Sequence, residues 1–415
     1  MSIRKSQGRK EILLLSVLCW VVYISAYLGR LNYMASLAEI IRAERFTKEQ
    51  AGAVGTGFFF TYGLGQLISG FLGDRLSPKW MVFGGLFTTG LVNAGMWRAH
   101  EAGGMMILWS INGLAQAFIW SPMIRIVVDY LEEDVRIKVC LFLNSAVPVG
   151  TMMAYGMTAA VIAAGKWRPV FAIASGVLLA MSLVWMIGMF CLERKMIRID
   201  RSRTEYGGGF GGKRLSFVGS GLILVMIALL VQGALKDGVT TWVPVYIGEN
   251  FAMSSSAAVL STMLIPLSNL AGVWLAAFVD RNWGKGEIRT SGIFFLICGG
   301  LLLILWGSSG RSLLLSLAML AMGTTAMMAV NTMLIAVLPS RFGGIGKAST
   351  VSGILNSTVY LGSALSTYGI GALSERWGWN VTILLWAFGA GVAAICCLAA
   401  VVKWKSYLFN YLSRH

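Results

Sequence analysis

The sequence predicts an all-α membrane protein in which 12 transmembrane helices form two pseudo-symmetric six-helix bundles. Apolar segments of about 18 or more residues, the length that a helix needs to cross a bilayer, recur along the whole chain. Only 13% of the 415 residues are charged, whereas a soluble globular protein carries about 25%. Motifs of the first half return in the second half, which predicts an internal repeat. Transmembrane β-strands would be short and would alternate in polarity, so a barrel is excluded.

Twelve apolar spans account for the predicted helices. The first span follows Arg4, Lys5, Arg9 and Lys10 and continues past Ala26 without a cleavage site. We interpret it as an uncleaved helix and not as a signal peptide. The predicted spans are residues 12–39, 50–73, 80–98, 103–129, 138–164 and 167–191 in the first half, and 216–247, 255–279, 288–308, 311–337, 348–373 and 379–402 in the second half.

One long hydrophilic stretch separates the sixth span from the seventh. It runs from Glu193 to Arg214 and contains seven Lys and Arg residues and the glycine-rich run 207–212. This composition is typical of a flexible linker. We therefore predict an N-terminal bundle at residues 1–192, a cytoplasmic linker at residues 193–214 and a C-terminal bundle at residues 215–415.

Lys and Arg residues are distributed unequally between the two sides of the predicted membrane. With both termini placed inside, the inner segments contain 23 of these residues and the outer loops contain 8. The other three of the 34, Arg30, Arg125 and Lys236, fall within the spans. Positively charged loops remain in the cytoplasm. We predict a protein of the cytoplasmic membrane with both termini in the cytoplasm.

The composition excludes several other classes of protein. The net charge of +16 could indicate nucleic-acid binding, but the basic residues form short clusters between apolar spans, so we expect no nucleic-acid partner. The six cysteines show no metal-ligand spacing, and His100 and His415 lie outside the spans. We expect no metal and no cofactor. The spans contain no nucleophile and base that could form a catalytic pair, so we do not expect an enzyme.

Two polar motifs repeat between the halves. The Asp74-Arg75 pair returns as Asp280-Arg281, 206 residues later, in the loop after the corresponding helix. Within the fifth and eleventh spans, Asn144 and Asn356 occupy the same position of the pattern Leu-Asn-Ser-x-Val-x-x-Gly. These asparagines could bind ligand hydroxyls or join helices by hydrogen bonds. A parallel repeat of six spans is typical of transporters whose central site opens alternately to each side.

Two cations, Arg30 and Lys236, occupy apolar helices and are also 206 residues apart. A charge at the centre of a bilayer costs about 2.5–3.5 kcal/mol on insertion scales, so such residues usually serve a function. Tyr23, Tyr27 and Arg30 share one helical face because of their i, i+4, i+7 spacing. The alternative for Arg30 is a side chain that extends to the outer interface. Few acids are available in the spans, which indicates an anionic ligand.

The partner of Lys236 is open between two possibilities. It could pair with its neighbour Asp237, but adjacent residues on a helix point about 100° apart. Asp237 could instead pair with Arg125 of the fourth span. Arg125 follows a predicted kink at residues 120–122, and it is either a third contact for the anion or a structural partner of Asp129. For Arg125 we favour the structural role.

The sequence resembles the major facilitator superfamily over nearly its full length. The segment Gly70-Phe-Leu-Gly-Asp-Arg-Leu-Ser-Pro-Lys79 is similar to the superfamily's signature in the loop after the second helix. Within the superfamily the chain resembles the organophosphate:phosphate antiporters. The motifs that carry this resemblance are Tyr23-x-x-x-Tyr27-x-x-Arg30-x-Asn32, Leu235-Lys236-x-Gly238-x-x-x-Trp242-x-Pro244-x-Tyr246, Tyr62-Gly63 and Tyr360-Leu361-Gly362.

The chain departs from the antiporter pattern at three positions. Leu31 follows the first-helix arginine where the family often has a second basic residue. Gln66 replaces a second-helix lysine, and Val147 replaces a histidine of the glycerol-phosphate exchangers. These differences leave the identity of the solute open.

The resemblance implies a role for each candidate residue. Arg30 and Lys236 would clamp one phosphate between the two bundles, and the Asp-Arg pairs would latch the cytoplasmic ends of helices. The residues that would line the cavity or contact the solute are Tyr23, Tyr27, Tyr62, Gln66, Trp242, Tyr360, Asn144 and Asn356. The residues expected to act in gating or in structure are Asp74, Arg75, Asp280, Arg281, Arg125 and Asp237.

The resulting prediction is a secondary active antiporter for a small organic anion, with inorganic phosphate as the counter-substrate. We expect a monomer in the lipid bilayer. One alternative is a proton-coupled carboxylate transporter or a drug exporter, for which Asp237 is the candidate proton carrier. Another alternative is a transporter-like sensor that binds phosphorylated ligands.

Overall fold

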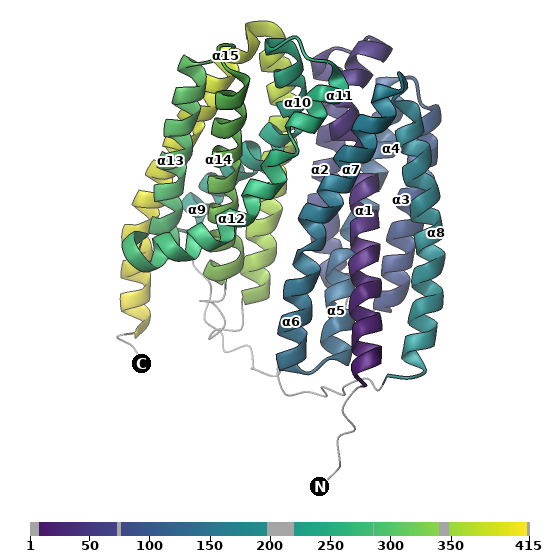
Figure 1. The fold of residues 1–415 in the computed structure, drawn as a ribbon. Helices are drawn as coiled ribbons and strands as arrows, with labels where there is room; N and C mark the ends of the chain where they lie inside the picture. Colours follow the sequence, from purple (N-terminus) through teal and green to yellow (C-terminus); the bar gives the residue numbers. More distant parts are fainter. Residues whose placement is uncertain (1–7, 73–75, 197–219, 285, 340–347, 413–415) are drawn as a thin grey trace.

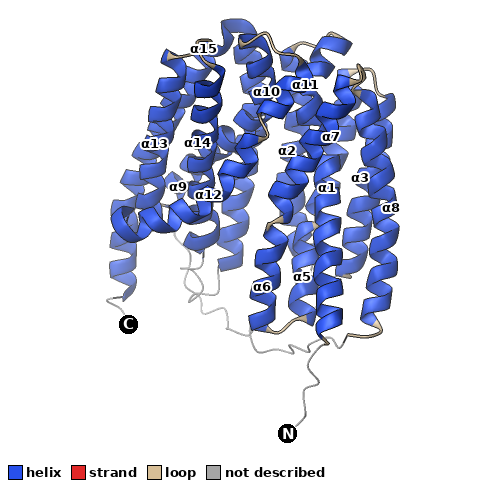
Figure 2. Cartoon of the chain, in the orientation of Figure 1, coloured by secondary structure: helices blue, strands red, loops and turns tan. Residues whose placement is uncertain are grey.

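The computed structural model describes residues 8–72, 76–196, 220–284, 286–339 and 348–412, and every regular element within these ranges is a helix (Figure 2). The first helix begins, and the last helix ends, on the same side of the molecule (Figure 1). We call this side the termini end and the opposite side the far end. The helices run between these two ends, as expected of a protein that spans a membrane.

Eight helices form the first bundle, in which α1 packs against α7 and α8, α2 against α4, and α3 against α8 (Figure 1). These helices are α1 (Arg9–Glu44), α2 (Lys48–Leu72), α3 (Pro78–Arg98), α4 (Ala102–Ala117), α5 (Trp120–Tyr130), α6 (Glu133–Asn144), α7 (Ala146–Ala163) and α8 (Arg168–Glu193). The pairs α4–α5 and α6–α7 are each one broken span, so the bundle contains six spans.

The second bundle also contains six spans, and α15 packs against both α9 and α13. Its elements are α9 (Leu222–Gly233), the π-helical turn η1 (Ala234–Gly238), α10 (Val239–Asn250), α11 (Ser255–Ser261), α12 (Leu264–Val279), the π-helical turn η2 (Asp280–Gly284), α13 (Glu287–Gly307), α14 (Leu313–Asn331), the π-helical turn η3 (Thr332–Val337) and α15 (Ala348–Leu412).

Proline explains three of the breaks within spans. Pro122, Pro148 and Pro266 are each the third residue of the helix that follows a break, in α5, α7 and α12. Proline lacks an N–H group and its ring clashes with the carbonyl four residues earlier, which disrupts the preceding helix at that point. The predicted kink at residues 120–122 is therefore present, with the break just before it at Phe118 and Ile119.

A single glycine separates the last two spans. Gly378 interrupts α15 with φ 76° and ψ 175°, a conformation that glycine adopts without the steric cost of a side chain. The chain thus crosses twelve times, as predicted. The fifth span begins at Glu133, five residues earlier than expected from the apolar pattern. The predicted linker falls mostly on residues 197–219, which lie outside the described residues, so the domain boundaries stay a prediction.

Polar side chains within the first bundle hold α1 in place. Asn32 donates to Asn93 of α3 at 2.7 Å, and Asn93 donates in turn to the carbonyl of Thr89. Asn112 and Gln116 of α4 donate to the carbonyls of Gly29 and Ala26, at 2.8 and 3.0 Å. Hydrogen bonds of this kind fix one helix against another inside the membrane. They orient α1 so that its opposite face is directed away from α3 and α4.

The two bundles touch through α2 and α15 at the far end. A Cβ on Gly52 would lie 2.7 Å from the carbonyl oxygen of Thr367, and one on Gly371 would lie 2.4 Å from that of Lys48. Only glycine permits this approach of two backbones.

Charged side chains reinforce the same contact. Lys48 Nζ lies 2.7 Å from Glu249 Oε2 of α10, and Trp379 Nε1 donates to the same oxygen at 2.6 Å. Glu49 accepts from the hydroxyl of Tyr368 and pairs with Arg376 at 3.5 Å. We call these six residues the far-end seal.

A second contact at the far end joins α1 and α7 to α11. Ser255 donates to the buried carboxylate of Glu39 at 2.8 Å, and Ser256 donates to the carbonyl of Ala159 at 2.9 Å. These polar contacts between the bundles lie at the far end, and α2 and α15 also pack against each other at the level of Gly63 and Tyr360.

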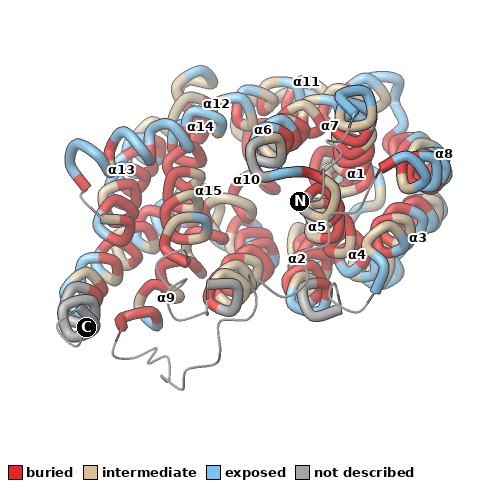
Figure 3. Tube along the Cα trace, turned by 90° about the horizontal axis from the view of Figure 1, so that it is seen from below, coloured by how far each residue is buried: buried red, intermediate tan, exposed pale blue. Residues whose placement is uncertain are grey.

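Exposed residues lie on the periphery when the molecule is viewed from the termini end, for example on α8 and α13 (Figure 3). Many of them are large and apolar, including Ile187 at 65% exposed and Leu296 at 56%. Such a surface suits contact with lipid rather than with water.

Candidate functional site

Arg30 lies among aromatic rings at the junction of the bundles. Its Cζ atom is 4.4 Å from the ring centre of Tyr62, 5.6 Å from that of Phe58 and 5.9 Å from that of Tyr27. The ring centre of Tyr360, from the second bundle, lies 4.7 Å from that of Tyr62. Arg30 is therefore directed toward the second bundle, and the alternative of a side chain that extends to the outer interface is excluded.

Glycine brings the two tyrosines together. A Cβ on Gly63 would lie 3.0 Å from the Cβ of Tyr360, so α2 and α15 can approach closely at this level only because position 63 has no side chain. The close approach places Tyr62 and Tyr360 in an edge-to-face contact with an interplanar angle of 69°.

Tyr23 and Tyr27 extend the site along α1 toward the termini end. Their ring centres are 5.3 Å apart, with an interplanar angle of 82°. Tyr23 also stacks on Trp120 of α5, with 4.4 Å between ring centres. The predicted shared face of Tyr23, Tyr27 and Arg30 is thus present, with Trp120 as an additional wall.

Lys236 and Asp237 form an ion pair, which corrects the expectation that they do not face each other. Lys236 Nζ lies 3.3 Å from Asp237 Oδ1, and both side chains are about one-fifth exposed. Ser363 of α15 donates to Asp237 Oδ2 at 2.9 Å. Adjacent side chains also diverge in the π turn η1, but the long lysine side chain bends back over the backbone, so its ammonium group reaches the neighbouring carboxylate.

The ion pair and Arg30 lie near the same tyrosine of α15. Arg30 contacts Tyr62, whose ring meets that of Tyr360. Ser363, one helical turn from Tyr360, donates to Asp237. One charged group thus comes from α1 of the first bundle and a charge pair comes from η1 of the second. We call the set of Tyr23, Tyr27, Arg30, Tyr62, Lys236, Asp237 and Tyr360 the central site.

Trp242 does not line the central site as predicted. Its side chain is fully buried, its Nε1 donates to the carbonyl of Thr367 at 2.9 Å, and its ring packs against Gly52 and Gly371. These partners belong to the far-end contact between α2 and α15. Trp242 therefore fills the closed end of the molecule in this conformation.

Three amide residues were predicted to contact the solute. Gln66 is half-buried and accepts from Ser121 of α5 at 3.4 Å. Asn356 is half-buried on α15, one helical turn from Tyr360 toward the termini end. The side chain of Asn144 lies outside the described residues.

Arg125 was considered as a partner of either Asp237 or Asp129. Asp237 pairs with Lys236, and Asp129 has an interaction of its own. Within the described part of the chain Arg125 forms no ion pair, and its buried Nη1 atom has no hydrogen-bond partner. The favoured structural role as a partner of Asp129 stays a prediction.

The predicted latch residues are tested in part. Asp280 accepts from Thr290 at 2.6 Å and from the backbone N–H of Gly286 at 3.0 Å. It thus fastens the loop between α12 and α13, and Arg281 beside it is exposed. In this conformation Asp280 makes these contacts within its own bundle. Asp74 and Arg75 lie outside the described residues.

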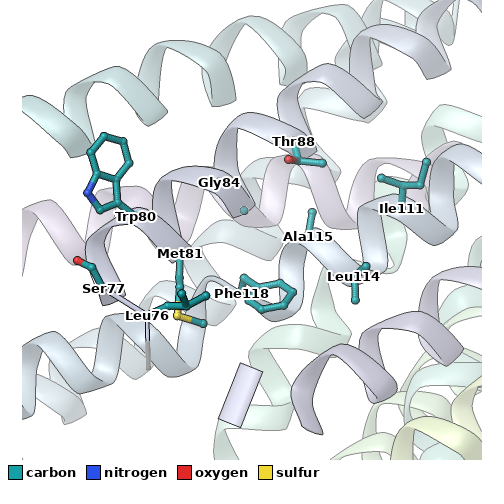
Figure 4. Close-up of a pocket in the computed structure, with 11 residues that line it drawn as sticks. Leu76, Ser77, Trp80, Met81, Gly84, Thr88, Ile111, Leu114, Ala115 and Phe118 are labelled. Atoms are coloured by element: carbon teal, nitrogen blue, oxygen red, sulfur yellow. The ribbon is translucent and has the colours of Figure 1, made fainter. Parts of the chain in front are cut away.

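A separate groove lies between α3 and α4, away from the central site (Figure 4). It has a volume of about 490 Å³ and an apolar lining that includes Trp80, Met81, Leu114 and Phe118. None of its lining residues is charged, so it offers no group that could bind an anion.

The sequence patterns missed several residues of the site. Phe58 precedes Tyr62 by one helical turn, so the shared face could have been recognised from spacing alone. Ser363 gave no such signal, because serine is common in membrane helices. Asn93, Asn112 and Gln116 stood out as polar residues in apolar spans, but their role in holding α1 requires the packing.

Comparison with known proteins identifies the family. The family model described as "Major Facilitator Superfamily" matches residues 19–367. A "Probable hexose phosphate transport protein" of Chlamydia muridarum is 22% identical over 387 residues, covering 86% of this chain and 84% of that protein. The "Membrane sensor protein UhpC" of Salmonella typhimurium is 22% identical over 416 residues, covering 94% of this chain and 91% of that protein.

Solved structures agree on the fold. A bacterial homologue of the human lysosomal transporter Spinster, in an inward-facing and occupied conformation, superposes with a TM-score of 0.70 at 15% identity, over 98% of this chain and 97% of that one. The proteins named here are a transport protein, a membrane sensor protein and a transporter, and none of them is an enzyme. Since the family model covers most of its length, the chain belongs to the major facilitator superfamily.

Proposed function

We propose that the protein is an alternating-access antiporter that exchanges a small organic phosphate for inorganic phosphate across the cytoplasmic membrane. The observation that carries this proposal is that Arg30 and Tyr62 of the first bundle meet Tyr360 of the second. Ser363, one helical turn along α15 from Tyr360, donates to Asp237, so Arg30 and the Lys236–Asp237 pair, one from each bundle, lie near the same tyrosine. A phosphate placed between them contacts both bundles at once. Such a ligand can couple its own binding to the movement of one bundle against the other.

Arg30 is suited to bind the phosphate group directly. A guanidinium is planar, always charged, and forms two parallel hydrogen bonds to a phosphate. The surrounding rings of Tyr62, Phe58 and Tyr27 restrict its orientation through cation–π contacts. The hydroxyl groups of Tyr27 and Tyr360 supply further hydrogen bonds, and the aromatic walls contact the organic part of the solute.

Lys236 binds phosphate by exchanging partners. In the empty site its ammonium group is paired with Asp237, which Ser363 also holds. A phosphate that approaches Lys236 competes with Asp237 for the ammonium group. The sequence indicated two uncompensated cations in the empty site. Because Lys236 is paired with Asp237, only Arg30 remains uncompensated among the residues of the central site.

This charge balance explains obligatory exchange. Closing the empty site would leave the charge of Arg30 in a medium of low dielectric constant without an anion, which is unfavourable. A bound phosphate compensates that charge, so the loaded carrier can close and change its orientation. Each crossing of the empty carrier is then slow compared with a crossing of the loaded one.

The inside orientation of the termini is part of the proposal and rests on the distribution of Lys and Arg residues. The bundles touch at the far end, through the far-end seal and the contact of Ser255 with Glu39. With the termini inside, this conformation is closed toward the outside.

A counterflow assay tests the proposal. Purified protein in vesicles loaded with inorganic phosphate should take up labelled phosphate, hexose phosphates or glycerol phosphate, and Arg30→Gln should abolish the uptake. Lys138→Gln, which removes an exposed cation of α6, serves as the matched control and should retain it. Undiminished uptake by Arg30→Gln would refute the clamp.

A sensor is the second candidate function, favoured by the similarity to a relative named as a membrane sensor protein over 94% of the chain. The counterflow assay, combined with a thermal-shift measurement of ligand binding, distinguishes a sensor from an antiporter. A sensor should bind phosphorylated ligands in a thermal-shift measurement without supporting exchange, whereas an antiporter should do both.

A further inference from the structure

Arg125 carries a positive charge that no described residue neutralises. Among the residues that the structure describes it forms no ion pair, and its buried Nη1 atom has no hydrogen-bond partner. The carboxylate of Asp237 is paired with Lys236. A guanidinium nitrogen that is removed from water without a partner costs free energy. An anion that binds there would recover this free energy.

Arg125 lies on the face of α5 that points away from the core of the first bundle. The core side of α5 is formed by Ile119, Met123, Ile126 and Val127. Positions 121 and 125 are one turn apart and lie on the opposite side. Ser121 on that side donates to Gln66 of α2.

The position of α5 in the bundle agrees with this orientation. Seen from the termini end, α5 lies on the inner side of the first bundle, while α3 and α8 lie farther from α10 and α15 (Figure 3). Since α5 packs chiefly against α3, the opposite face, which carries Arg125, is directed away from α3.

The level of Arg125 along α5 is also defined. Trp120 stacks on Tyr23, at the edge of the central site. Arg125 is five residues farther along the helix, or about 7.5 Å at 1.5 Å per residue, and α5 ends at Tyr130. Arg125 thus lies between the central site and the termini end.

We propose that Arg125 is a second phosphate-binding residue, which holds the phosphate group of a solute arriving from the termini end before that group reaches Arg30. The proposal rests on the function proposed above. The ligand chemistry is a phosphate monoester or inorganic phosphate, bound through the planar guanidinium. Because only the phosphate group is held there, Arg125 does not distinguish one organic phosphate from another.

The test is the concentration dependence of exchange, with inorganic phosphate as the probe, in vesicles containing the full chain. Arg125→Gln should raise the half-saturating concentration about tenfold, as expected for the loss of one charge-assisted hydrogen bond, and should leave the maximal rate within about twofold. The rise should be smaller at high salt, because screening weakens the attraction already present in the unaltered protein.

Two control variants accompany the measurement. Lys138→Gln removes an exposed cation from the neighbouring helix α6 and should not change the half-saturating concentration. Arg125→Lys keeps the charge but not the planar fork, and should give an intermediate value. If Arg125→Gln does not fold, Arg125→Lys alone decides the question, because the loss of the fork should still raise that concentration.

An unchanged half-saturating concentration in both Arg125 variants would overturn the proposal. A lower maximal rate with an unchanged half-saturating concentration would also overturn it, because that result is expected of a purely structural role. Failure of this inference is distinguishable from failure of the proposed function. In the first case Arg30→Gln still abolishes exchange, and in the second case the unaltered protein shows no exchange at all.

Discussion

At the scale of single residues, Asp237 sets the charge of the central site. It compensates Lys236 at 3.3 Å and is held by Ser363, so the empty site has a net charge of about +1 from these side chains and Arg30. In the proposed mechanism Asp237 is the counter-ion that phosphate displaces.

Asp237→Asn should separate binding from turnover. Removal of the carboxylate leaves Lys236 free, so phosphate no longer has to compete and its equilibrium dissociation constant should fall about tenfold. The empty site then has two uncompensated cations, and the maximal exchange rate should fall because the carrier releases phosphate slowly. Equilibrium binding of labelled phosphate and counterflow in vesicles measure the two quantities.

Ser363→Ala is a second variant of the same site. It removes one hydrogen bond of Asp237 and leaves the ion pair with Lys236, so its effects should be smaller than those of Asp237→Asn. Weaker phosphate binding by Asp237→Asn would contradict competition between the carboxylate and the ligand. Exchange that becomes dependent on a pH gradient in the unaltered protein but not in Asp237→Asn would favour the proton-coupled alternative.

At the scale of the elements, close backbone contacts decide how α15 is placed. A Cβ on Gly362 would lie 2.0 Å from the carbonyl oxygen of Leu230 in α9, and one on Gly233 would lie 2.0 Å from that of Val359. These two glycines let α9 and α15 pack backbone to backbone. Ser363 and Tyr360 of the central site lie on the segment of α15 that this contact fixes.

Gly362→Ala should therefore destabilise the protein. The added methyl group cannot fit without separating α9 from α15, and overpacking of this kind costs about 1–3 kcal/mol or more. A lower midpoint of thermal unfolding in detergent and a loss of exchange are expected.

Gly369 of the same helix provides the matched control, because a Cβ there meets nothing within 4 Å. Gly369→Ala should leave the unfolding midpoint unchanged or raise it slightly, since alanine favours helix over glycine by about 1 kcal/mol. Equal midpoints for the two variants would show that the α9–α15 contact does not limit stability.

At the scale of the whole molecule, the far-end seal determines which side of the transporter is closed. Lys48 and Glu49 of α2 bind α10 and α15 through side chains, and Gly52 with Gly371 allows the backbones to touch. The ion pairs are partly exposed, with Glu249 at 42%. Each contributes about 0–1 kcal/mol, which allows the seal to open during a transport cycle.

Glu249→Gln should shift the molecule toward the conformation that is open at the far end. The substitution weakens the contacts of one carboxylate with both Lys48 and Trp379, so the closed state should lose about 1 kcal/mol, roughly a fivefold change in population. Distances between spin labels placed on the far-end tips of α2 and α15 would report a larger fraction of long separations.

Glu101→Gln is the control for that measurement, because Glu101 is exposed at the same end and precedes α4. It should leave the distance distribution unchanged. A distribution in Glu249→Gln that equals the one in Glu101→Gln would mean that the glycine contact alone holds the far end closed.

The sequence alone predicted the architecture. The hydrophobic length of each span and the 206-residue repeat are local or periodic properties, and they do not depend on which helices pack together. Twelve spans, the shared face of Tyr23, Tyr27 and Arg30, and the kink at residues 120–122 all follow from such patterns. Arg30 was identified because a charge in an apolar helix is rare, whatever its neighbours are.

The tertiary structure decided which polar groups meet. The contact of the Lys236–Asp237 pair with Ser363 depends on the packing of η1 against α15. The burial of Trp242 at the far end depends on the approach of Gly52 and Gly371. Side-chain partners are set by packing between helices that are distant in sequence. A periodic pattern shows which residues share a face of a helix, but it does not specify which residues of other helices that face contacts.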